Sequence, residues 1–128
     1  MSKILIKKFN KIVNEFADEL SAILPNDKNI AIFKSHLSVV GMLDDTQIIK
    51  NFIEHVYPYK KNILDKDEEF FLETEIKHDH DYLSDSLHIK QLWKDKLSDS
   101  NKEIVWKYFQ VLIVLSEKYI VRGNSLKL

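Results

Sequence analysis

Cysteine is absent from the 128 residues, and glycine and proline occur only twice each. Without cysteine the chain can form no disulfide, no thiolate zinc site and no thiol nucleophile. Two isolated glycines, Gly41 and Gly123, cannot build the glycine-rich loop that holds phosphate in nucleotide-binding enzymes. The longest unbroken apolar run, Val111 to Leu115, is far shorter than a membrane span. We therefore expect no transmembrane segment and no cofactor, and no catalytic motif points to an enzyme.

Hydrophobic residues make up 45% of the sequence and charged residues 30%, which is the balance of a folded globular protein. The length fits one domain spanning residues 1–128. The first residues do not form a secretory signal, because Lys3, Lys7 and Lys8 interrupt their apolar stretch. These features predict a single-domain intracellular protein.

The formal net charge of −1 conceals an uneven distribution. Residues 65–85 contain nine acidic residues and two lysines, so that the rest of the chain is mildly basic. A strongly acidic segment repels nucleic acid, and any contact with nucleic acid would fall on the flanking parts.

In the first half of the chain, apolar residues recur at spacings of three and four. Over residues 3–24 this spacing predicts one amphipathic helix. Asp27 can cap a second helix, which we expect to end at Gly41. A third helix is predicted from Asp44 or Asp45 to a stop at Pro58.

The second half predicts further helices around a polar segment. Residues 59–64 fit either a short helical turn or a loop, and the acids of residues 67–69 favour a helix start. Residues 74–84 are polar and aperiodic, which is typical of an exposed loop, and a helix is expected to follow as far as Leu97. Ser100 and Glu103 have the spacing of a capping box ahead of the last helix.

The middle of that last helix is apolar on nearly every face, because Val111, Ile113 and Val114 extend its apolar stripe. A helix of this kind is normally buried from several sides. The sequence thus predicts an all-α fold, a single compact bundle of five to seven helices around a central apolar C-terminal helix.

Partner-binding residues are predicted around the middle of the chain. Proline fixes the turn at Tyr57-Pro58-Tyr59, and burying both tyrosine rings there is difficult, so one is expected to be exposed. Adjacent Phe70 and Phe71 diverge by about 100° on a helix, which leaves one ring nearer the surface. The acidic residues beside these rings complete the predicted partner-binding set: Asp67, Glu68 and Glu69.

The first helix carries a basic patch opposite its apolar stripe, formed by Lys3, Lys7, Lys8 and Lys11. Asp18 and Glu19 lie near the other end of this helix. Both placements oppose the helix dipole at a cost of some tenths of a kcal/mol per charge. An anionic partner would offset that cost, and the choices are a phosphate backbone, a lipid headgroup or an acidic protein surface. A solvated lysine-rich face is the plainer interpretation.

His78 and His80 are the sharpest polar pair in the sequence. In an extended segment both imidazoles point the same way and could share a metal with Glu73 or Glu75. A solvated acidic loop with two histidines in it explains the same residues. The metal interpretation would make the chain a metal-dependent hydrolase.

Three stretches resemble a known group of proteins: Val56-Tyr57-Pro58-Tyr59-Lys60 followed by Ile63, Lys66-Asp67-Glu68-Glu69-Phe70-Phe71-Leu72, and Leu92-Trp93 with Asn101-Lys102-Glu103-Ile104-Val105-Trp106-Lys107-Tyr108-Phe109-Gln110. They are similar to small all-helical proteins of unknown function from nucleocytoplasmic large DNA viruses of algae and protists. The resemblance implies only a setting, which is a viral protein acting inside an infected cell or packaged in a virion.

Three functions remain open from the sequence. The first is a non-enzymatic interaction or scaffold module that binds another protein or itself. The second is a nucleic-acid-associated protein that uses the lysines of the first helix. The third is a metal-dependent enzyme at His78 and His80.

Overall fold

The computed structural model describes residues 2–68 and 92–126. Within these ranges the chain forms five α-helices and no β-strand, so the predicted all-α fold is confirmed. The α-helices are α1 (Ser2–Ile23), α2 (Lys28–Leu43), α3 (Gln47–His55), α4 (Lys60–Leu64) and α8 (Asp99–Leu126). A 3-10 turn (Tyr57–Tyr59) precedes α4, and a π-helical turn (Leu92–Lys96) precedes α8.

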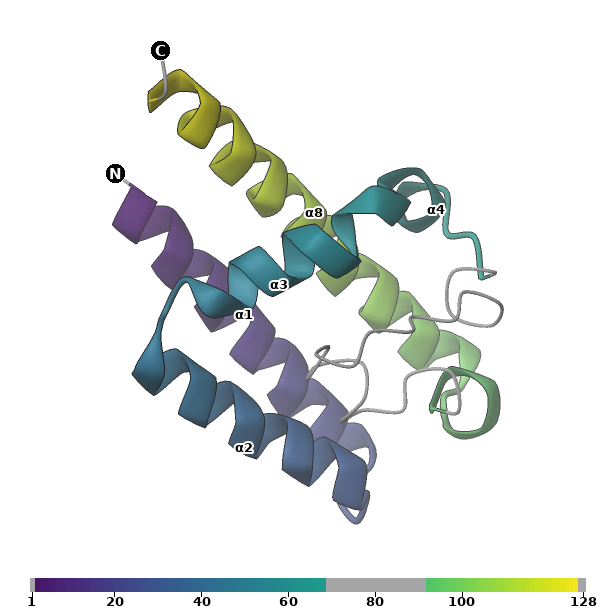
Figure 1. Ribbon diagram of the computed structural model, residues 1–128. Coiled ribbons are helices and arrows are strands. Elements are labelled where there is room, and N and C mark those ends of the chain that lie inside the picture. The colour runs from purple at the N-terminus through teal and green to yellow at the C-terminus, as the bar shows by residue number, and fades with distance from the viewer. Residues whose placement is uncertain (1, 69–91, 127–128) are drawn as a thin grey trace.

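The two longest helices, α1 and α8, lie antiparallel and side by side (Figure 1). As a result, the start of α1 and the end of α8 lie at the same end of the molecule (Figure 1). α2 packs against α1, and α3 contacts α1, α2 and α8. α1 and α8 together therefore form the centre of the described fold.

Four phenylalanines join the three helices at this centre. Phe9 of α1 meets Phe52 of α3 edge to face, with ring centroids 5.4 Å apart. Phe16 of α1 and Phe52 both reach Phe109 of α8, at 5.6 and 6.2 Å. Such pairs contribute about 0.5–1.5 kcal/mol beyond the burial of their area. The spacing of three and four along α1 brings these rings to one face.

A second aromatic contact attaches the π-helical turn to α8. Trp93 is buried and meets Trp106 edge to face at 5.1 Å. The Lys102 ammonium lies 5.3 Å from the centroid of the Trp93 ring, within the range of a cation–π interaction. Both tryptophans therefore belong to the core.

Two predicted helix boundaries are wrong. α2 continues through Gly41 to Leu43, and Gly41 does not adopt the left-handed conformation that ends helices. α8 starts at Asp99, one residue before the predicted capping box, because the Ser98 hydroxyl, and not that of Ser100, accepts a hydrogen bond from the N–H of Asn101 at 3.2 Å. Asp27 does cap α2 as predicted.

α8 is less enclosed than its apolar sequence predicts. Ile113 is buried, whereas Val111 and Val114 are 43% and 47% exposed. The described helices cover one broad side of α8, and these two valines lie outside it. A helix can therefore be apolar nearly all round without being covered all round.

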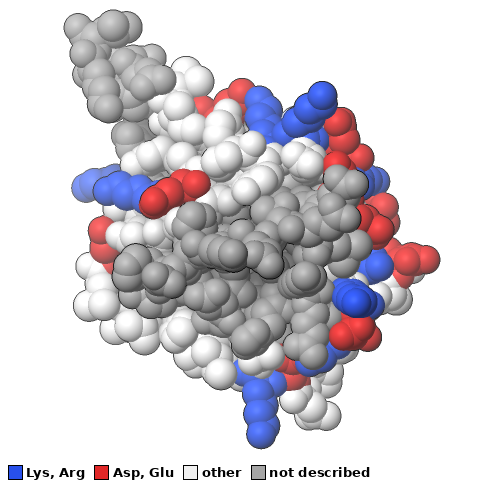
Figure 2. All heavy atoms as spheres, turned by 45° about the vertical axis from the view of Figure 1, so that its right-hand side comes forward, with Lys and Arg blue, Asp and Glu red and all other residues white. Residues whose placement is uncertain are grey.

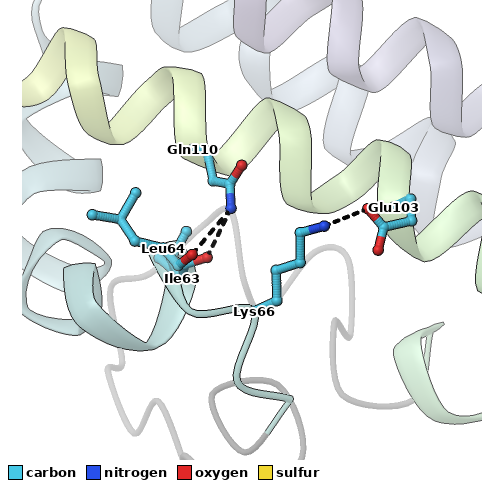
Figure 3. Close-up of polar contacts among 5 residues, drawn as sticks. All are labelled: Ile63, Leu64, Lys66, Glu103 and Gln110. Carbon is cyan, nitrogen blue, oxygen red and sulfur yellow. Dashed lines mark hydrogen bonds and ion pairs between the residues drawn. The ribbon is translucent and has the colours of Figure 1, made fainter.

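Polar side chains of α8, spaced seven residues apart, hold the α4 segment. The Gln110 amide donates to the carbonyl oxygens of Ile63 (3.3 Å) and Leu64 (3.5 Å), as Figure 3 shows. Glu103, seven residues before Gln110, pairs with Lys66 at 2.8 Å (Figure 3). Glu117 pairs with Lys60 at 2.8 Å at the other end of the segment. We call Glu103, Gln110 and Glu117 the polar stripe of α8.

Candidate functional site

The predicted tyrosine contact lies in the turn between α3 and α4. Tyr57 and Tyr59 are both half-buried and pack against the hydrophobic core, while Pro58 is exposed. The Lys60 ammonium lies 5.9 Å from the centroid of the Tyr57 ring. A hydrogen bond to the Glu117 carboxylate raises the pKa of Lys60 above its ordinary value. The turn thus leaves both tyrosines half-buried, whereas one exposed ring was expected.

Two acidic residues that follow α4, Asp67 and Glu68, already have partners within the chain. Lys66 adopts the left-handed conformation, with φ 55°, and its turn brings the Asp67 carboxylate within 3.1 Å of the Asn62 amide. Glu68 lies 3.7 Å from the Lys102 ammonium. The remaining residues of the predicted partner-binding set lie outside the described residues: Glu69, Phe70 and Phe71. Their assignment as partner-binding residues stays a prediction.

The four lysines of the first helix lie together, as predicted. Lys3, Lys7, Lys8 and Lys11 are all exposed on the side of α1 that faces away from the core. The same side of α1 continues with Glu15, Asp18, Glu19 and Ala22. We call this whole surface, with Ile4, the outer face of α1. It is basic in its N-terminal half and acidic in its C-terminal half.

The acidic half of the outer face borders a hollow of about 340 Å³. Glu15, Asp18, Glu19, Ala22 and Tyr108 line it. Burial, followed by the negative charges of Glu19, Glu15 and Asp18, raises the pKa of the Tyr108 hydroxyl. Asp18 also pairs with Lys34 of α2 at 3.1 Å. The hollow is therefore a site of negative potential that favours a cation.

A second surface on α2 was missed by the sequence prediction. Ile32, Val39, Met42 and Leu43 are 47%, 55%, 85% and 83% exposed, and we call them the α2 ridge. Ile30, Phe33 and Leu37 of the same helix are buried. α2 is thus apolar on two sides, one packed against the core and one exposed. The available signal was a helix with apolar residues outside its core stripe and no acidic residue from 28 to 43.

Charges of both signs are interspersed along the rim of the face shown in Figure 2. Charged residues of the described chain also form the ion pairs given above, including Lys66–Glu103. Interspersed, paired charges produce no extended field of one sign. The outer face of α1, by contrast, has its basic and acidic residues in separate halves.

The predicted metal pair, His78 and His80, lies outside the described residues and stays a prediction. Within residues 2–68 and 92–126, no group of three or more His, Cys, Asp or Glu side chains could hold a metal ion. A zinc titration followed by calorimetry tests the histidine pair directly, and absence of heat in the micromolar range would refute it.

Comparison of the chain with protein-family models, curated proteins and solved structures gives no match. In the described part of the chain, each helix is too short or too polar to cross a bilayer. Function must therefore be argued from the surfaces themselves.

Proposed function

We propose that this protein is a non-enzymatic interaction module that binds another protein through the α2 ridge. The observation that carries the proposal is the exposure of four large apolar side chains along one side of a helix whose other side is already buried. Contiguous exposed apolar side chains of this kind mark interaction sites more often than isolated ones do.

The α2 ridge has the chemistry of a protein-binding surface. Ile32, Val39 and Leu43 are spaced seven and four residues apart, so they share one face, and Met42 lies beside them. Full burial of one such side chain contributes about 1.5–3 kcal/mol. Methionine adapts its shape to a partner surface. The partner is expected to offer an apolar groove with a neutral or acidic rim, because Lys28 and Lys34 are the charged residues of α2.

The resemblance described above adds a setting to this proposal, which is a viral protein in an infected cell or a virion. The sequence motifs are its support. The tyrosines and acids around residues 57–71 remain predicted contacts of the same interaction function.

Affinity capture of the tagged protein from its native cell or infection, with and without nuclease, tests the proposal. We expect a stoichiometric protein partner that survives nuclease and is lost in a Met42→Ser/Leu43→Ser variant. Leu64→Ser is the matched control, because Leu64 is an exposed leucine outside the ridge. Retention of every partner by the ridge variant would refute the α2 ridge as the binding surface.

A second candidate function is nucleic-acid binding by the basic half of the outer face of α1. Its supporting observation is that Lys3, Lys7, Lys8 and Lys11 are all exposed within nine residues of one helix. Phosphate contacts of this kind weaken steeply with added salt. Fluorescence anisotropy with a short duplex is the test, and absence of binding at low salt would exclude this function. The acidic half of the same face disfavours a long duplex.

A further inference from the structure

The outer face of α1 divides its charges by sign along the helix axis. Lys7, Lys8 and Lys11 occupy the N-terminal half, and Asp18 and Glu19 lie in the C-terminal half. The buried residues of α1 lie on the opposite side of the helix. The charged side is therefore largely exposed along the 22-residue helix, about 33 Å in length, with Glu15 half-buried.

This order of charges does not stabilise an isolated α1. Lys3, Lys7 and Lys11 follow one another at spacings of four, and like charges at that spacing repel. No acidic residue occupies the first turn of α1 and no basic residue its last turn, so the charges near both ends oppose the helix dipole. Among the described residues, Lys34 pairs with Asp18 of this face. The arrangement calls for a partner with the opposite order of charges.

We infer that the outer face of α1 binds the same face of a second copy of this chain, with the two α1 helices antiparallel. Reversing the helix direction places the basic half of each copy against the acidic half of the other. This inference goes beyond the proposed function. It uses a surface different from the α2 ridge.

The spacing along α1 supports this pairing residue by residue. When Lys11 is level with Glu15 of the second copy, Lys8 is level with Asp18 of that copy. In the same register, Lys7 is level with Glu19. The positions from Lys8 to Asp18 alternate steps of three and four residues, which is the spacing of a helix–helix seam. Because the pairing is two-fold symmetric, every contact between opposite charges occurs twice.

The ends of the seam and the hollow fit the same arrangement. Ile4, 73% exposed, comes level with the small Ala22 of the second copy. Ala22 also lines the acidic hollow, together with Glu15, Glu19 and Tyr108. The hollow thus receives the N-terminal turns of the second copy, where the lysines are. Antiparallel alignment also places each basic helix start beside the negative dipole end of the other helix.

Sedimentation equilibrium of the full chain at about 0.01 M and about 1 M salt tests the inference, because the Debye length falls from about 30 Å to about 3 Å over that range. We expect a monomer–dimer equilibrium at low salt that shifts to monomer at high salt. Lys7→Glu/Lys11→Glu should weaken self-association by at least about tenfold, since it converts attractions to repulsions. Lys61→Glu/Lys94→Glu, at exposed lysines on other elements, changes the net charge equally and should leave the dimer intact.

A mixing experiment adds a test that loss of folding cannot imitate. Neither Lys7→Glu/Lys11→Glu nor Glu15→Lys/Asp18→Lys should associate alone, but an equimolar mixture should form a heterodimer. A monomeric wild type at low salt, or a dimer unaffected by the α1 variants, would overturn the inference. If Met42→Ser/Leu43→Ser abolishes the dimer and the α1 variants do not, this inference fails while the proposed function stands.

Discussion

Asp27 joins two distant parts of the chain, and its replacement tests how they are held together. Its carboxylate accepts hydrogen bonds from the N–H groups of Asn29 (2.9 Å) and Ile30 (3.2 Å) at the start of α2. It also pairs with the Lys96 ammonium at 2.5 Å, and its side chain is 5% exposed. Asp27→Ala removes both the helix cap and the ion pair with Lys96, whereas Asp27→Asn keeps the cap and removes only the charge.

The two substitutions should differ by a measurable amount. Loss of a helix N-cap costs about 0.5–2 kcal/mol, and an ion pair to a partly exposed lysine contributes about 0.2–1 kcal/mol. Asp27→Ala should therefore cost about 2 kcal/mol and Asp27→Asn less than about 1 kcal/mol. With an unfolding entropy of about 0.27 kcal/mol/K for a chain of this length, the Ala variant should lower Tm by about 7 °C.

The pH dependence separates the charge from the cap. Burial raises the pKa of Asp27, but the hydrogen bonds from Lys96, Ile30 and Asn29 outweigh it and leave the pKa below its ordinary value. The unfolded chain therefore takes up the proton first as the pH falls. The stabilisation by the Asp27 charge is complete above the ordinary pKa of an aspartate. It is lost as the pH falls through the lower pKa that Asp27 has in the folded protein.

Thermal unfolding followed by circular dichroism, at neutral pH and in acid, is the assay. The difference in Tm between wild type and Asp27→Asn should narrow in acid. When both chains also carry Lys96→Met, this difference in Tm should vanish at neutral pH. The reasoning is refuted if Asp27→Ala leaves Tm unchanged. It is also refuted if the difference in Tm between wild type and Asp27→Asn is the same at both pH values.

Three further substitutions test the core and the charges of α1. Phe9→Ala removes a fully buried ring that contacts Phe52 and should cost about 4 kcal/mol, or about 15 °C in Tm; Ile4→Ala, at an exposed position of the same helix, should cost less than about 0.5 kcal/mol. Ser116→Ala should leave the free energy of unfolding in urea unchanged or raise it by up to about 1 kcal/mol, because the buried Ser116 hydroxyl has no hydrogen-bond partner among the described residues; a loss above 1 kcal/mol on this scale would show that the hydroxyl is bonded. Lys7→Glu should raise Tm slightly in dilute solution, because it replaces the repulsion of Lys7 with Lys3 and Lys11, each four residues away, by attraction. A lower Tm would contradict the argument that the wild-type order of charges destabilises α1.

Features that depend on neighbouring residues could be predicted from the sequence. The Asp27 cap follows from a short polar side chain placed just before an apolar pattern, and the structure has it. The lysines of α1 were placed correctly on the exposed side because the apolar spacing alone fixes that side. Gly41 was predicted wrongly, since a glycine ends a helix only when the chain turns left-handed there. Ser100 was predicted as the cap because Glu103 follows it three residues later, but α8 starts at Asp99, directly after Ser98.

Features that depend on which neighbours cover a helix could not be predicted in this way. Val111 and Val114 are apolar like Ile113, yet only Ile113 faces other described helices closely enough to be buried. The exposed α2 ridge escaped prediction for the same reason, because apolar residues outside the core stripe of α2 do not show whether a neighbouring helix covers them. The separation of charge on α1 was visible in the sequence. Its self-complementary order becomes meaningful only once both halves are known to share one exposed face.

The polar stripe of α8 has a consequence for how the folded chain opens. In α4 only Ile63 is buried, so the segment is held largely by hydrogen bonds and ion pairs with Glu103, Gln110 and Glu117. Contacts of this kind can be broken together without disturbing the phenylalanine centre. Amide hydrogens of α4 should therefore exchange through a local opening, well before those around Phe9 and Phe109. The α4 segment is the part of the described fold that can detach and return as a unit while α1, α3 and α8 stay packed.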